Sequence, residues 1–102
     1  CFDSSPQVAE EFVDRGLHIS FAGNVTRGGH KKLKSAARHA PLGRLLVETD
    51  CPFMKPVSVD ADYNEPAYVA RNLEKIAELR EADPEELAET TTRNAEELFL
   101  PE

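Results

Sequence analysis

The sequence has 102 residues, the size of one small domain, with a formal net charge of −7 and a pI near 4.9. This acidic balance disfavours nucleic-acid binding by overall charge, and no apolar run is long enough to cross a membrane. Two cysteines are too few for a disulfide framework. They favour a reduced, cytoplasmic protein in which Cys51 is a small buried thiol.

The charge is unevenly distributed along the chain. Residues 60–102 carry thirteen acids and four bases. Residues 27–44 contain no acid and hold six of the twelve lysines and arginines: Arg27, Lys31, Lys32, Lys34, Arg38 and Arg44. A basic segment can contact a phosphate backbone, and on a helix with a thin apolar stripe it is also typical of a solvated outer face. Both interpretations remain open.

The first half of the chain predicts two helices and two strands. A helix begins at Ser4-Ser5-Pro6, where serine supplies the cap and proline the first turn, and it ends near Gly16. The apolar run 17–22 predicts a strand, residues 30–39 predict a helix, and residues 45–49 predict a second strand. Residues 51–63 contain two prolines within five positions, which predicts a loop.

Two more helices are predicted after this loop. Asn64-Glu65-Pro66 is typical of a helix cap, and Asp83-Pro84 begins a last helix with Glu86 three residues after its cap. Both strands are continuous apolar runs, typical of parallel strands covered on both faces, and a third strand is predicted at Cys1-Phe2. Alternating strands and helices predict an α/β protein, and so few strands indicate part of a larger fold.

Two acids follow the second predicted strand. In α/β barrels the active site lies at the carboxyl ends of the strands, and the stretch LLVETD puts Asp50 at such an end. A carboxylate there can bind a divalent cation or act as an acid or base. Because side chains alternate along a strand, Glu48 and Asp50 are expected to share a face. The spacing alone leaves a simple turn or cap open as the alternative.

Five stretches of the sequence match the motifs of a known enzyme family, in the family's order. They are CF, ISFAGNVTR, LLVETDCPFMKP, NEPAYV and TTTRNAEELF, and together they span essentially the whole chain. On these residues the protein resembles the TatD family of metal-dependent deoxyribonucleases, which are amidohydrolase-like TIM barrels. The resemblance implies that residues 1–102 are the C-terminal βα units of a single barrel domain, with the N-terminal part of the barrel absent from the chain.

The resemblance also implies a site for one or two divalent ions (Mg, Mn or Zn), with Asp50 as a catalytic and metal-binding residue. In the family, histidines and a glutamate complete the ligand set, and only the aspartate has a counterpart here. Glu48 is a candidate for supporting the metal ligands or for a structural hydrogen bond. Arg27 is a candidate for the substrate rim, and Asn64 for holding the loop or for capping a helix. No family ligand position is matched by the three histidines, His18, His30 and His39.

The implied reaction is hydrolysis of a phosphodiester bond in DNA or a similar substrate. A catalytic metal takes about three protein ligands, so one carboxylate leaves the segment inactive by itself. The family often has basic residues before NEP, where this sequence has DADY, so phosphate contacts by this loop are not expected. The alternative is a truncated, non-catalytic remnant that self-associates through exposed sheet edges and acts as a binding module.

Overall fold

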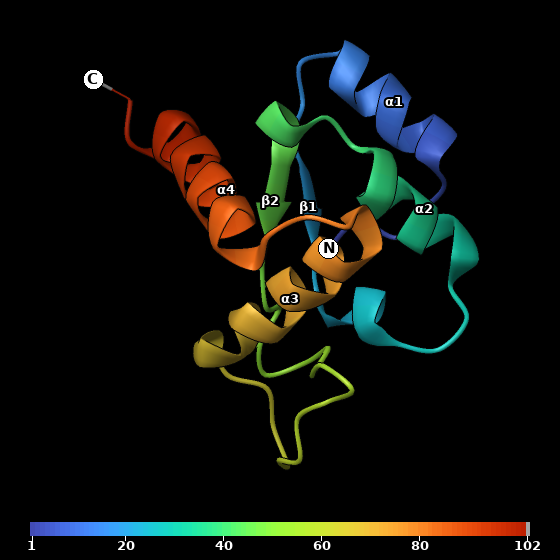
Figure 1. Ribbon diagram of the computed structural model, residues 1–102, viewed down its shortest axis with the longest axis vertical. Helices are drawn as coiled ribbons and strands as arrows, with labels where there is room; N and C mark the ends of the chain where they lie inside the picture. The colour runs from blue at the N-terminus through green and yellow to red at the C-terminus, as the bar shows by residue number, and fades with distance from the viewer. Residues whose placement is uncertain (102) are drawn as a thin grey trace.

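The computed structural model describes residues 1–101 and has an α/β architecture (Figure 1). Its two strands, β1 (Ile19–Phe21) and β2 (Leu45–Val47), run parallel, with Ser20 opposite Leu46 in the register. The α-helices of the described chain are α1 (Pro6–Asp14), α2 (Lys31–His39), α3 (Val69–Arg80) and α4 (Pro84–Phe99). Short 3-10 helices join them: η1 (Gly23–Thr26), η2 (Leu42–Arg44) and η3 (Pro66–Tyr68).

The helices pack against one another in chain order. Contacts join α1 to α2, α2 to α3, and α3 to α4, while α4 also packs on β2. Figure 1 shows the strands between α1 and α2 on one side and α4 on the other, with α3 in front. The crossover from β1 to β2 runs through α2, as a parallel strand pair requires. This arrangement confirms the predicted order of helices and strands.

The core lies on one face of the sheet. Ile19, Phe21 and Leu45 alternate with the other strand residues, share that face and are completely buried. All four helices contribute to the same hydrophobic cluster. Ser20 and Leu46 occupy the opposite face and are only half-buried. Within the described residues the hydrophobic cluster thus covers one face of the sheet, and the other face is only half-buried.

Local signals in the sequence locate the helix ends well. The Ser5 hydroxyl accepts a hydrogen bond from the Val8 amide at 3.3 Å, and the Asp83 carboxylate accepts one from the Glu85 amide at 3.2 Å. The predicted N-caps at Ser5 and Asp83 are thus confirmed. Gly16 has a φ of 85°, a left-handed conformation that glycine adopts freely just after a helix.

The strands are shorter than predicted, and Cys1-Phe2 forms no regular strand. The Phe2 amide does donate to the Ser20 carbonyl at 2.8 Å, so this segment lies along β1. The Phe2 ring packs edge-on against Phe21, with ring centroids 5.7 Å apart. Cys51 is exposed, so its predicted burial is wrong. Cys51 follows the end of β2 in an open turn, where no core residues pack over it.

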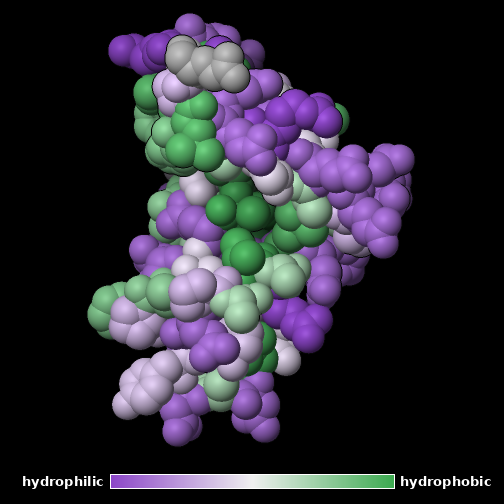
Figure 2. Space-filling view, turned by 90° about the vertical axis from the view of Figure 1, so that its left-hand side faces the viewer, coloured by the Kyte–Doolittle hydropathy of each residue, from purple (hydrophilic) through white to green (hydrophobic). Residues whose placement is uncertain are grey.

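An apolar surface lies on the side of the molecule occupied by α4. Figure 2 shows hydrophobic atoms on this side gathered between hydrophilic regions. Leu98 and Phe99 are 42% and 68% exposed. They sit in the last turn of α4, beyond the buried Leu87 and Thr91 of the same helix. None of the helices within residues 1–101 combines the length and hydrophobicity that a membrane span requires.

Candidate functional site at the strand ends

The candidate site lies where β2 ends. The Glu48 amide still donates to the Phe21 carbonyl at 2.9 Å, so pairing continues one residue beyond the strand. Asp50 is exposed and takes a left-handed conformation, with a φ of 60°. The Phe53 amide donates to the Asp50 carbonyl at 3.0 Å and closes a turn. The alternation that predicted a shared face for Glu48 and Asp50 does not reach Asp50, because the backbone there is no longer extended.

The buried side chain of Asn64 holds this turn through hydrogen bonds. It is 4% exposed, and its Nδ2 donates to the carbonyls of Thr49 and Phe53, each at 2.6 Å. Its backbone amide donates to the Pro52 carbonyl at 3.2 Å. The interpretation of Asn64 as a helix cap is wrong, because Glu65 occupies the cap position of η3. The Asn64 amide instead fixes both sides of the turn that presents Asp50.

The loop after Asp50 rests on η1, the turn that follows β1. A Cβ atom at Gly23 would lie 1.8 Å from the Met54 carbonyl oxygen, so only glycine permits this approach. The Thr26 hydroxyl donates to the Gly23 carbonyl at 2.6 Å and accepts a hydrogen bond from the Val57 amide at 3.0 Å. Arg27 follows Thr26 directly and is exposed. It therefore lies beside this loop.

Glu48 is held through both its main chain and its side chain. Its carboxylate Oε2 lies 3.1 Å from the backbone nitrogen of Cys1, and its carbonyl accepts a hydrogen bond from Asn72 Nδ2 at 2.8 Å. Asn72 is completely buried on α3. The structure thus places the Glu48 carboxylate beside Cys1 and ties the Glu48 main chain to α3.

Sequence reasoning missed the supporting role of Asn72. A sequence pattern could have revealed it, because Asn72 is a polar residue on the apolar stripe of a helix, four positions before the buried Ile76. Asn24, also missed, donates from Nδ2 to the Phe2 carbonyl at 3.3 Å. The Oδ1 atoms of Asn24, Asn64 and Asn72 are buried and have no hydrogen-bond partner within the described chain.

The described residues do not form a complete site for the metal that the family resemblance implies. Within residues 1–101, no group of three or more His, Cys, Asp or Glu side chains is placed to hold an ion. His18 is half-buried just before β1, and His30 and His39 are exposed at the two ends of α2. A catalytic metal takes about three protein ligands. A single exposed carboxylate such as that of Asp50 is too few ligands to hold a catalytic metal.

Comparison with known proteins identifies the family. The family model for TatD related DNase matches residues 1–100. The metal-dependent hydrolase YabD of Bacillus subtilis is 46% identical to this chain, and the 3'-5' ssDNA/RNA exonuclease TatD of Citrobacter rodentium is 38% identical. Each alignment covers 97% of this chain but only 39% and 40% of those two proteins, respectively. The chain thus spans about two fifths of the length of these relatives.

Solved structures share the fold. The crystal structure of YJJV, a TatD homologue from Escherichia coli, matches with a TM-score of 0.89 at 33% identity, over 99% of this chain and 39% of that one. A TatD family hydrolase from Entamoeba histolytica matches with a TM-score of 0.88 at 18% identity. These matches confirm the expected α/β fold of part of a TIM barrel. With its family match over residues 1–100, the chain belongs to the TatD related DNase family.

Proposed function

We propose that the protein is a metal-dependent hydrolase of phosphodiester bonds. The observation that carries this proposal is the exposed Asp50 carboxylate, presented by a firmly held turn at the carboxyl end of a parallel strand. Relatives named as a metal-dependent hydrolase and as an ssDNA/RNA exonuclease support a nucleic-acid substrate, DNA among them. The free thiols of Cys1 and Cys51 support a cytoplasmic location.

Each candidate residue has a distinct part in this proposal. Asp50 is a catalytic residue and one ligand of a divalent ion, either Mg, Mn or Zn. Asn64 positions Asp50 through the turn, Glu48 supports the neighbouring strand ends, and Arg27 contacts a substrate phosphate at the rim. The remaining metal ligands come from polypeptide outside residues 1–102, which form the last βα units of one barrel domain. The segment is accordingly inactive by itself.

A nuclease assay on the full-length gene product tests this proposal. We expect cleavage of single-stranded DNA that depends on an added divalent ion and is abolished by EDTA. Asp50→Ala is expected to lower the rate by more than about 100-fold, because even residues behind metal ligands contribute about 10- to 100-fold. The matched control is Asp62→Asn, which changes an exposed aspartate farther along the same loop. Undiminished activity in Asp50→Ala would remove Asp50 from the site.

A non-catalytic, self-associating module is the second candidate. It is favoured by the two-stranded sheet and by the apolar surface at the end of α4, where Phe99 and Leu100 are 68% and 74% exposed. Sedimentation of the isolated 102-residue chain tests it. Concentration-dependent dimers that disappear in the full-length product show that the surface belongs to the rest of the barrel. Dimers that persist in the full-length product favour the module.

A further inference from the structure

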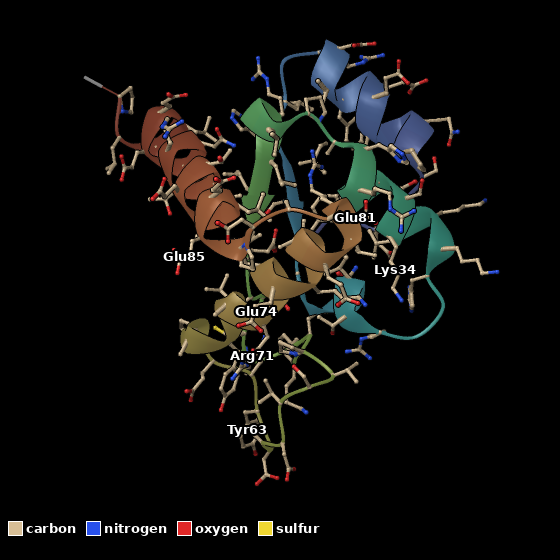
Figure 3. All side chains as sticks on the ribbon, in the orientation of Figure 1. Lys34, Tyr63, Arg71, Glu74, Glu81 and Glu85 are labelled. Carbon is tan, nitrogen blue, oxygen red and sulfur yellow. The ribbon has the colours of Figure 1, made fainter. Side chains whose placement is uncertain are left out.

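The loop that begins at Asp50 exposes two aromatic side chains. Phe53 is 72% exposed and Tyr63 is 74% exposed. Figure 3 labels Tyr63 on this loop, which projects away from the helices. Among residues 1–101 the ring pairs join Phe2 to Phe12 and to Phe21, so neither loop aromatic stacks on another ring. An exposed aromatic ring offers a π-face on which a base can stack.

Both aromatics are attached to a backbone that is held in place beside Asp50. The Phe53 amide donates to the Asp50 carbonyl, and the Phe53 carbonyl accepts from Asn64 Nδ2. Tyr63 directly precedes Asn64, whose amide donates to the Pro52 carbonyl. The same asparagine therefore fixes the attachment points of both rings. Because the loop backbone is already held, ligand binding costs less conformational entropy of the protein.

The charges of this loop do not suit a phosphate. Its one cation, Lys55, donates from Nζ to the Val59 carbonyl of the same loop. The loop also carries two exposed acids, Asp60 and Asp62. Exposed cations lie instead outside the loop, at Arg27 and in the first turn of α2. A base has a π-face that stacks on an aromatic ring whatever the charge around it, whereas phosphates need cations.

We propose that Phe53 and Tyr63 stack on unpaired bases of a single-stranded nucleic acid at the Asp50 site. This inference rests on the proposed function and adds to it the residues that bind the bases. The base faces of a duplex are covered by neighbouring base pairs, so this loop favours unpaired strands over duplex. In this proposal the loop that begins at Asp50 binds bases, and Arg27 binds phosphates.

Fluorescence anisotropy on the full-length gene product in EDTA measures this binding without cleavage. The probes are a labelled oligothymidine, an abasic strand of the same length, and a matched duplex. We expect Phe53→Ala and Tyr63→Ala each to weaken oligothymidine binding by about tenfold and to change abasic binding by less than about twofold. Phe53→Tyr and Tyr63→Phe, which keep the ring, retain binding. The loop control is Val57→Ala, which shortens a non-aromatic side chain that is 62% exposed.

Three results overturn the inference. They are equal losses on the oligothymidine and the abasic strand, no loss in either alanine variant, and a wild-type protein that does not bind oligothymidine. Metal-dependent cleavage of the same oligothymidine by the wild-type protein is measured separately. If the wild-type protein cleaves the oligothymidine but the alanine variants bind it normally, only the stacking role is refuted. If binding depends on the aromatic rings but no cleavage occurs, the proposed hydrolase function is refuted and the loop is a single-strand binding surface.

Discussion

Replacing Asn64 with alanine tests how the turn that presents Asp50 is held. The substitution removes two hydrogen bonds, to the Thr49 and Phe53 carbonyls, both 2.6 Å long. Each is worth about 1 kcal/mol net, and a carbonyl left unpaired in a partly buried place costs more. Because Phe53 is exposed and water can reach its carbonyl after a small opening, we expect a total loss of about 2–3 kcal/mol.

Hydrogen exchange at the Phe53 amide measures this loss where it occurs. That amide closes the turn by donating to the Asp50 carbonyl, so it exchanges when the turn opens. A loss of about 2–3 kcal/mol corresponds to exchange that is about 30- to 160-fold faster, if the turn opens locally. Full-length protein is used, with denaturation in urea to record the global free energy of unfolding.

The matched control is Asn94→Ala. Asn94 also donates two hydrogen bonds, to the Leu42 and Leu45 carbonyls at 2.6 and 2.9 Å, but at the opposite end of β2. We expect this variant to lower global stability by a similar amount and to leave Phe53 exchange unchanged. Unchanged Phe53 exchange in Asn64→Ala, or an equal acceleration in both variants, would refute the view that Asn64 is a local clamp.

Two further substitutions test packing around the strand ends and between helices. Gly23→Ala places a Cβ against the Met54 backbone, so we expect a loss of about 1–3 kcal/mol in urea denaturation, while Gly43→Ala, with open space around its Cβ, changes stability by less than about 0.5 kcal/mol. Arg80 donates to two carbonyls at the end of α2, each at 2.8 Å, and burial lowers the pKa of its guanidinium. It stays charged at neutral pH, so Arg80→Ala is expected to cost about 2–3 kcal/mol in the same assay, against less than about 0.5 kcal/mol for the exposed Arg71→Ala. Equal effects within either pair would contradict these expectations.

The helix starts and the α/β class follow from short-range patterns. Ser5 and Asp83 cap helices because a side-chain oxygen needs only to reach an amide two or three residues away. The apolar runs predict both strands for a similar reason, since their hydrophobicity marks the core. Their lengths were overestimated. Leu17, at the start of the first run, is 50% exposed, because chain geometry and not hydrophobicity decides where pairing begins.

The support of the candidate site depends on contacts that short-range patterns do not contain. Asn64 reaches back 15 residues to Thr49, Asn72 reaches back 24 residues to Glu48, and Asn94 reaches back 49 residues to Leu45. An asparagine before Glu-Pro is typical of a helix cap whether or not a distant carbonyl needs its amide. Four buried asparagines that bond to main-chain carbonyls are therefore a property of the folded chain, visible in the sequence only as polar residues at apolar positions.

Metal binding by the full-length gene product tests the role of Asp50 most directly. Isothermal titration with Mn²⁺ compares the wild-type protein with Asp50→Asn and with Asp62→Asn, which removes an exposed carboxylate of the same loop. We expect Asp50→Asn to weaken binding by more than about 100-fold and Asp62→Asn to leave it unchanged. Equal affinity in the wild-type protein and Asp50→Asn would contradict a metal site at the end of β2.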